Sequence, residues 1–284
     1  ELLGGWSRGT HPNAPAVVIN TQTIPDMEYI KEEDGALRIG GQTRLRDIAE
    51  NEVVKTRYTA LAEAARKTAS PTLRRMGTIG GNICQETRCW YYRAKDNYFD
   101  CKMKDGNECF AATGDNRFHS IFGGVKGCMA VNPSDTAPAL VALDAKVVTS
   151  KRVIDAEKFW AAHEYGLTAL EEDEIVVEIR IPAPAAGTKS AFIKYATRGS
   201  IDFPIVNCAV MVSPENTRIC LNAVAPNPYR AVLAEEVVKG KVIDEALAEA
   251  AGEAAVSKSK PLAKNKFKVQ IAKTLVKRAL LACQ

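Results

Sequence analysis

The chain has 284 residues, of which 46% are hydrophobic and 25% are charged, and its formal net charge at pH 7 is +4. These values are typical of a globular protein with room for two domains and a sizeable core. No apolar run approaches the roughly 18–20 residues of a membrane span, and the weak, dispersed charge does not favour nucleic acid binding. We therefore expect neither a membrane span nor a nucleic acid partner.

The first part of the chain alternates short apolar segments with helical ones. An alanine-rich run that ends before Ser70-Pro71 predicts one helix, and Ser134 and Asp135 can cap a second, short helix. The predicted strands cover residues 16–20, 37–40 and 146–149, and the predicted helices cover residues 58–67 and 134–143.

A different pattern begins near residue 173. Apolar segments of strand length follow one another, and three helical segments then close the chain. Strands followed by helices indicate an α+β domain separate from the first, so we divide the chain into residues 1–172 and 173–284. The predicted strands are 174–182, 190–196, 205–212 and 218–224, and the predicted helices are 230–239, 243–257 and 263–282.

Three short polar segments could contact a ligand. In Thr78-Ile79-Gly80-Gly81-Asn82, paired glycines allow positive φ and remove the Cβ, so backbone N–H groups could point at a phosphate or a ring edge. Gly4-Gly5 suggests a second strand-to-glycine turn. In Asn132-Pro-Ser-Asp135, the aspartate could accept hydrogen bonds from ribose hydroxyls. Taken singly, each segment is better explained as a tight turn or a helix cap.

Five of the eight cysteines fall within 45 residues, in a stretch with little apolar periodicity. The chain is neither short nor cysteine-dense, which argues against a disulfide framework. A loop this long is uncommon in a compact domain, and a metal centre would support it. Four thiolates suit an iron–sulfur cluster, but they suit tetrahedral zinc as well. The candidates are Cys89, Cys101, Cys109 and Cys128, whereas Cys84 is interpreted as a packed strand residue and Cys208, Cys220 and Cys283 as buried small hydrophobes.

Three ordered motifs resemble those of a known family. Thr78-Ile-Gly-Gly-Asn82, Asn132-Pro-Ser-Asp-Thr-Ala-Pro138 and Arg198-Gly-Ser-Ile-Asp-Phe-Pro204 are similar to the motifs of the FAD-binding medium subunit of molybdenum hydroxylases, the xanthine dehydrogenase and carbon monoxide dehydrogenase family. The cysteine stretch resembles that of a subgroup with an extra 4Fe-4S cluster. This subgroup includes the flavin subunits of 4-hydroxybenzoyl-CoA reductase and of a bacterial periplasmic aldehyde oxidoreductase.

The resemblance implies an α+β fold. A two-lobed FAD-binding domain of the vanillyl-alcohol-oxidase-like type would carry an inserted iron–sulfur loop at residues 83–130, and an α+β C-terminal domain of antiparallel strands and then three helices would follow it. The resemblance also implies site residues: Gly80, Gly81 and Asn82 at the FAD diphosphate, with Thr78 and Ile79 near it; Gly4 and Gly5 in a first phosphate loop; Asp135 at the ribose, assisted by Ser134; Lys194 and Asp202 near the flavin ring; and Cys89, Cys101, Cys109 and Cys128 on the 4Fe-4S cluster.

The implied function is that of an electron-transfer flavoprotein subunit of a multi-subunit molybdopterin-dependent hydroxylase or dehydrogenase. It would pass electrons between 2Fe-2S clusters of a small partner subunit, FAD and the 4Fe-4S cluster, while a large partner subunit carries molybdopterin. No catalytic residue is expected on this chain, and an external electron carrier is a further expected partner. We expect a cytoplasmic location, although a complex can be exported on a partner's signal. Two alternatives stay open, namely a structural zinc lobe and a flavin-free scaffold.

Overall fold

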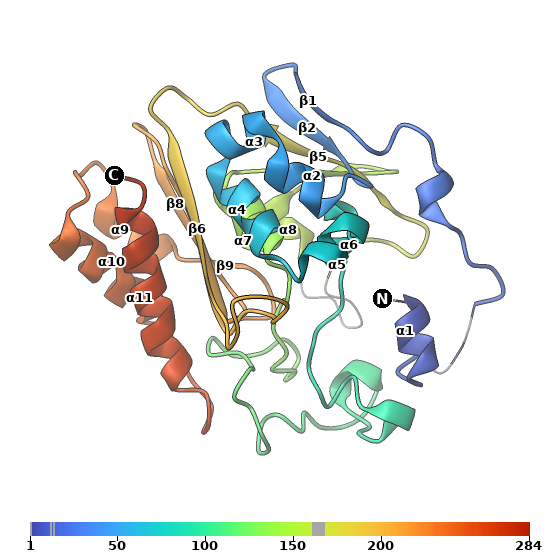
Figure 1. Cartoon of the computed structure of the whole chain (residues 1–284). Helices are drawn as coiled ribbons and strands as arrows, with labels where there is room; N and C mark the ends of the chain where they lie inside the picture. The colour runs from blue at the N-terminus through green and yellow to red at the C-terminus, as the bar shows by residue number, and fades with distance from the viewer. Residues whose placement is uncertain (1, 12, 14, 161–167) are drawn as a thin grey trace.

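Two antiparallel sheets form the framework of the molecule (Figure 1). The structure, a computed structural model, describes residues 2–11, 13, 15–160 and 168–284. The first sheet has the strand order β1-β2-β5-β3-β4 and the second β6-β7-β8-β9. The first contains Ile30–Glu33 (β1), Ala36–Gly40 (β2), Lys146–Thr149 (β3), Val153–Asp155 (β4) and Val176–Pro182 (β5), and the second contains Lys189–Tyr195 (β6), Val206–Val212 (β7), Thr217–Asn222 (β8) and Tyr229–Arg230 (β9).

Helices α4 (Thr59–Lys67) and α7 (Thr136–Ala142) pack between the two sheets. Their alanines allow close approach, and all of α7 is buried. They share one apolar core with residues of both sheets, such as Ile179 and Phe192. The other helices of this part are Leu2–Ser7 (α1), Leu45–Glu50 (α2), Glu52–Arg57 (α3), Pro71–Met76 (α5), Ile79–Ile83 (α6) and Ala156–Phe159 (α8), with 3-10 turns at Thr21–Thr23, Lys95–Asn97 and Lys102–Lys104.

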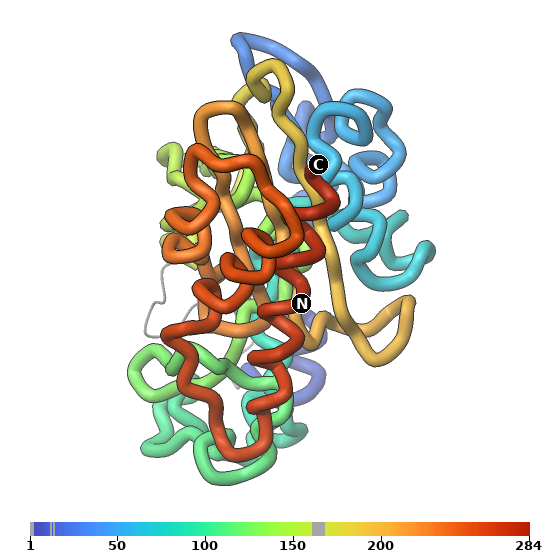
Figure 2. Tube along the Cα trace, turned by 90° about the vertical axis from the view of Figure 1, so that its left-hand side faces the viewer, coloured from blue at the N-terminus to red at the C-terminus, as the bar shows by residue number. Residues whose placement is uncertain are grey.

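The opposite face of the second sheet is covered by α9 (Val232–Val238), α10 (Glu245–Val256) and α11 (Phe267–Leu281) (Figures 1 and 2). Side chains of β7 alternate between the two faces, as those of a strand must. Ala209 faces α4 and α7, while Cys208 faces the C-terminal helices. Three of the strands predicted for this part, at 190–196, 205–212 and 218–224, and the three terminal helices are thus confirmed. None of the helices in the described residues has the length and apolarity needed to cross a bilayer.

One predicted strand does not form, and another lies in a different sheet from the one expected. Residues 16–20 are irregular: Val17 and Ile19 are 74% and 75% exposed, and no described segment pairs with them. An extended segment forms a strand when a neighbour binds its backbone groups. The strand predicted at 174–182 is β5, which pairs with β2 and β3 in the middle of the first sheet. The first sheet therefore takes its central strand from beyond residue 172, because strand pairing is a long-range property.

The segment between α6 and α7 crosses to one end of both sheets and is held there by the residues that lead into α11 (Figure 2). Lys260 donates its backbone N–H to the carbonyl oxygen of Ile121 at 2.6 Å, and the Asn265 amide donates to that of His119 at 3.1 Å. The buried Lys268 ammonium donates to the same His119 oxygen at 2.9 Å. Burial lowers the pKa of Lys268 to about 7.

Lys268→Met should remove a pH-dependent part of the stability. An unfolded lysine titrates near pH 10.4, whereas folded Lys268 releases its proton near 7. Between these values the unfolded chain binds more protons, so stability rises with pH through this group. Relative to the variant, wild type should gain up to about 1.4 kcal/mol per pH unit in urea unfolding between pH 7 and 10. Lys266→Met is the control, because Lys266 is an exposed lysine close by in the sequence. Identical pH profiles of stability for Lys268→Met and wild type would contradict this prediction.

Candidate functional site

The glycine-rich motif is the start of the short helix α6. The Thr78 side chain caps this helix, because its Oγ1 accepts a hydrogen bond from the Gly81 N–H at 3.1 Å. Neither Gly80 nor Gly81 has a positive φ. Of the two properties expected of the paired glycines, positive φ is therefore not used, since both residues are helical.

The two glycines are required for different reasons. A Cβ on Gly80 would lie 2.7 Å from the carbonyl oxygen of Gly41, so Gly80 allows two backbone segments to touch. A Cβ on Gly81 would meet the Thr78 hydroxyl at 3.2 Å, and Gly81 is exposed. Ile79 is buried and donates its N–H to the carbonyl of Thr43 at 2.9 Å. The turn is therefore closed on the Gly80 side and open on the Gly81 side.

Asn82 is buried and joins α6 to α7. Its Oδ1 accepts hydrogen bonds from the Ser134 hydroxyl at 2.6 Å and from the Thr136 hydroxyl at 2.7 Å. Ser134 Oγ also accepts from the Ala137 N–H at 3.1 Å, so Ser134 provides the predicted cap of α7. Asn82 Nδ2 makes no hydrogen bond within the described part of the chain, which leaves it available to a ligand.

The Asp135 carboxylate lies at the centre of a buried polar network that reaches the second sheet. Asp135 is 2% exposed, and its Oδ2 accepts from the Lys194 ammonium on β6 at 2.7 Å. Its Oδ1 accepts from the Asn207 amide on β7 at 2.9 Å. Burial raises the pKa of Asp135, and its two partners act in the opposite direction. The sequence had suggested that this carboxylate caps α7. It binds side chains of β6 and β7 instead.

Two strand asparagines that sequence reasoning missed complete this network. Asn222 on β8 donates its amide to the Ser134 carbonyl at 2.7 Å and to Asn132 Oδ1 at 3.2 Å. Asn207 and Asn222 are both fully buried. Each interrupts an apolar run in a predicted strand, and a polar side chain at such a position needs partners. That interruption was the signal available in the sequence.

Lys194 and Asp202 were both expected near a flavin ring, and in the structure they bind different partners. Lys194 belongs to the buried network and also donates to the carbonyl of Lys67 at 3.1 Å. Asp202 lies in the loop between β6 and β7, where it accepts from the Arg198 N–H at 2.9 Å and from its guanidinium. These contacts tie Asp202 to its own loop.

Gly4 and Gly5 lie within helix α1 instead of the expected strand-to-glycine turn. A Cβ on Gly5 would collide with the His11 ring, which explains why a small residue stands there. The His11 Nε2 lies 2.8 Å from a carboxylate oxygen of Glu86, so this end of the chain packs near the start of the cysteine-rich stretch.

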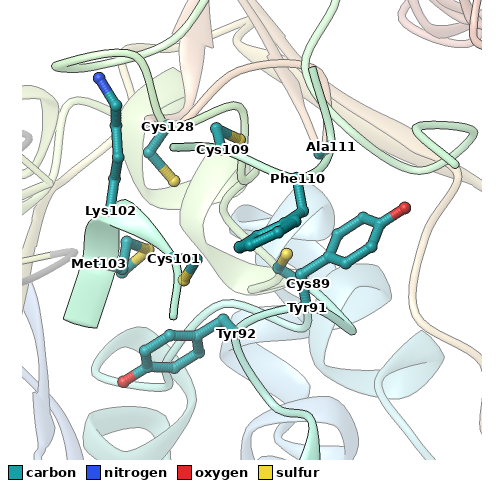
Figure 3. A pocket seen from close by; sticks show the side chains of 10 residues that line it. All are labelled: Cys89, Tyr91, Tyr92, Cys101, Lys102, Met103, Cys109, Phe110, Ala111 and Cys128. Atoms are coloured by element: carbon teal, nitrogen blue, oxygen red, sulfur yellow. The ribbon is translucent and has the colours of Figure 1, made fainter. Parts of the chain in front are cut away.

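The four cysteines predicted as ligands line one cavity (Figure 3). A hydrogen bond from the Cys128 thiol lowers the pKa of Cys109 to about 6 and raises that of Cys128. Cys84 follows helix α6 instead of lying in the expected strand, and it packs against the core between the sheets. Within the described residues, no three His, Cys, Asp or Glu side chains are close enough together to hold a single metal ion. The remaining walls of the cavity are Tyr91, Tyr92, Lys102, Met103, Phe110 and Ala111.

His119 also reaches the cysteine set, which the sequence did not indicate. Its side chain is buried, and its Nε2 lies 3.2 Å from the sulfur of Cys89. Burial lowers the pKa of His119 to about 4, so the ring is neutral at pH 7.

Comparisons with known proteins match both parts of the chain. Residues 7–184 match the family model of the FAD binding domain in molybdopterin dehydrogenase, and residues 191–283 match the CO dehydrogenase flavoprotein C-terminal domain. The aldehyde oxidoreductase FAD-binding subunit PaoB of Escherichia coli strain K12 is 34% identical over 252 residues, which cover 84% of this chain and 76% of that protein. The carbon monoxide dehydrogenase medium chain of Hydrogenophaga pseudoflava is 28% identical over 282 residues, covering 94% and 82%.

A solved structure shows the same fold over almost the whole chain. Carbon monoxide dehydrogenase from Hydrogenophaga pseudoflava, in a form that lacks the Mo-pyranopterin moiety, superposes with a TM-score of 0.73 at 29% identity, covering 99% of this chain and 87% of that one. The resemblance inferred from the ordered motifs is thereby confirmed for the family and for the α+β fold. The chain belongs to the FAD-binding subunits of the molybdopterin-dependent dehydrogenases and hydroxylases, a family of oxidoreductases.

Proposed function

We propose that this FAD-binding subunit relays electrons between 2Fe-2S clusters of a partner subunit, its own FAD and a 4Fe-4S cluster held by the four cysteines of the cavity. The observation that carries the proposal is the convergence of Cys89, Cys101, Cys109 and Cys128 on one cavity. When bound, FAD would interconvert one-electron and two-electron transfer, and the cluster would exchange single electrons. Molybdopterin and the substrate pocket would lie on a large partner subunit.

The open side of the α6 turn supports FAD binding there. Gly81 leaves room for a diphosphate, and Asn82 Nδ2 is free of partners among the described residues. Ser134 and Thr136 orient the Asn82 amide by donating to its oxygen, so that the nitrogen can donate to a phosphate. Thr78 holds the helix start through its hydroxyl.

The Asp135 carboxylate supports the site indirectly, through hydrogen bonds within the protein. Its two oxygens are each bonded within the protein, and the residue is almost fully buried. We therefore assign Asp135 and Lys194 the task of holding the Ser134 loop against the second sheet, where Ser134 in turn orients Asn82. A direct contact from Asp135 to the ribose stays a prediction, as does the placement of Asp202 near the flavin ring. A contact from Gly4 and Gly5 to an FAD phosphate likewise stays a prediction, although they lie in helix α1.

Four thiolates suit a 4Fe-4S cluster and a tetrahedral zinc alike, and iron analysis separates the two. We propose the cluster because the four cysteines border one cavity and the cysteine stretch resembles that of the cluster-bearing subgroup. Because exposed clusters suit a reducing compartment, we propose a cytoplasmic location, and an external electron carrier would meet the cluster side of the chain.

Gly81→Val should deplete FAD and cost less stability than a change at Gly80. The added side chain would lie on the exposed side of the turn, where the proposed diphosphate lies, and its Cβ would meet the Thr78 hydroxyl at 3.2 Å, whereas a Cβ on Gly80 would meet backbone. The matched change is Gly80→Ala, whose methyl group would press on the Gly41 carbonyl and cost about 1–3 kcal/mol of stability. Released flavin and thermal unfolding of both variants measure this difference. Normal flavin content in Gly81→Val would remove the turn from the FAD site.

Lys194→Met should destabilise the chain by about 3–5 kcal/mol, because it leaves the Asp135 charge buried without its partner. The double variant Lys194→Met/Asp135→Asn should be less destabilised, since no buried charge is left unpaired. Lys189→Met, at the exposed start of the same strand, is the control in thermal unfolding. If Asp135→Asn alone weakened FAD binding without changing the stability of the flavin-free chain, a direct contact to FAD would replace this structural role.

The cofactor content of the anaerobically purified complex tests the function itself. We expect one FAD per chain and about eight iron atoms, of which four belong to two 2Fe-2S clusters on the small partner. Cys109→Ala should lower iron to about four and leave FAD bound, whereas Cys84→Ala, a cysteine of the core, should keep both. Zinc without the additional iron would make the cysteine segment structural, and absence of flavin would identify the chain as a scaffold.

A further inference from the structure

We propose that His119 donates a hydrogen bond to the sulfur of Cys89 and thereby raises the reduction potential of the cluster that Cys89 binds. This inference rests on the proposed 4Fe-4S cluster and adds a residue that acts through a ligand. The distance from Nε2 to the sulfur, 3.2 Å, is within hydrogen-bonding range for sulfur. His119 lies 30 residues from Cys89 in the sequence, so the fold must bring them together.

Residues of the second domain fix the position of His119. The His119 carbonyl oxygen accepts hydrogen bonds from the Asn265 amide at 3.1 Å and from the Lys268 ammonium at 2.9 Å. The ring packs at an angle against Trp90 and Tyr91, with centroid separations of 5.8 and 6.1 Å. Both backbone and ring are therefore held, and the ring cannot turn away from Cys89 without losing these contacts.

The polar atoms of the ring point to the same role. Nδ1 is buried and makes no hydrogen bond to any described residue, which costs free energy. Nε2 therefore makes the polar contact of the ring within the described part of the chain, and that contact is with the sulfur. A histidine packed for shape alone would be better replaced by an apolar ring at this buried position.

An N–H donor on a ligand sulfur favours the more negative form of a cluster. One-electron reduction adds one negative charge and breaks no bond, and part of that charge resides on the thiolate sulfurs. Donation from His119 Nε2 stabilises this charge, and hydrogen bonds to the sulfurs are a recognised control of cluster potentials. In the proposed relay, a higher potential would shift the exchange of electrons between FAD and the cluster toward the reduced cluster.

The test is an EPR-monitored redox titration of the anaerobically purified complex, with iron counted in every sample. His119→Leu should keep the iron and shift the midpoint potential of the additional cluster to a more negative value. His119→Gln, whose amide can still donate, should stay near wild type. Phe118→Leu is the matched control, because Phe118 packs edge-on against the same Trp90 at 5.6 Å. An exchangeable proton coupled to the reduced cluster should be present in wild type and absent in His119→Leu.

An unchanged potential in His119→Leu with full iron would overturn the proposal. Loss of iron from both His119 variants, with iron retained in Phe118→Leu, would show that His119 binds the cluster or is needed for the local fold. That result would also overturn the proposal. Wild-type complex without the additional iron would instead show that the proposed cluster is wrong, which separates the two failures.

Discussion

The buried ion pair between Asp135 and Lys194 is the contact on which the candidate FAD site depends. It joins the loop before α7 to the edge strand β6 of the second sheet, and the Asn207 amide on β7 binds the other carboxylate oxygen. Charges this deeply buried are tolerated when each has a partner of good geometry. Because the same loop carries Ser134, the ion pair indirectly sets the direction of the Asn82 amide. The second domain thus shapes a site whose glycines belong to the first.

The cysteine segment depends on the second domain in a similar way. Hydrogen bonds from Lys260, Asn265 and Lys268 hold residues 119–121 against the start of α11. The segment has little apolar periodicity and few regular elements, so its backbone groups need partners from elsewhere. Both candidate cofactor sites of the chain are therefore built from first-domain residues and supported by second-domain residues. This arrangement gives a physical reason for the two domains to act as one electron-transfer unit.

The motif glycines show how one sequence feature can have two causes. Gly80 is explained by backbone packing against Gly41, without any ligand, whereas Gly81 is exposed and leaves the turn open. The sequence pattern offered two reasons for ligand binding, positive φ and the missing Cβ, and the helical backbone of α6 excludes the first. Position within the fold distinguishes the glycine that fits a structural need from the one that a cofactor would use.

The sequence by itself determined the element types wherever periodicity was long and regular, as in α4, α10, α11 and the strands β6 to β8. These depend on local propensity and on which side of an element is apolar. It also identified the family through ordered motifs and selected four cysteines that share one cavity. Only the tertiary structure decided the sheet of β5, the partners of Asp135 and the approach of His119 to Cys89. Those features join residues that lie 30 to 140 or more positions apart in the sequence. Local sequence patterns do not specify which distant groups come into contact.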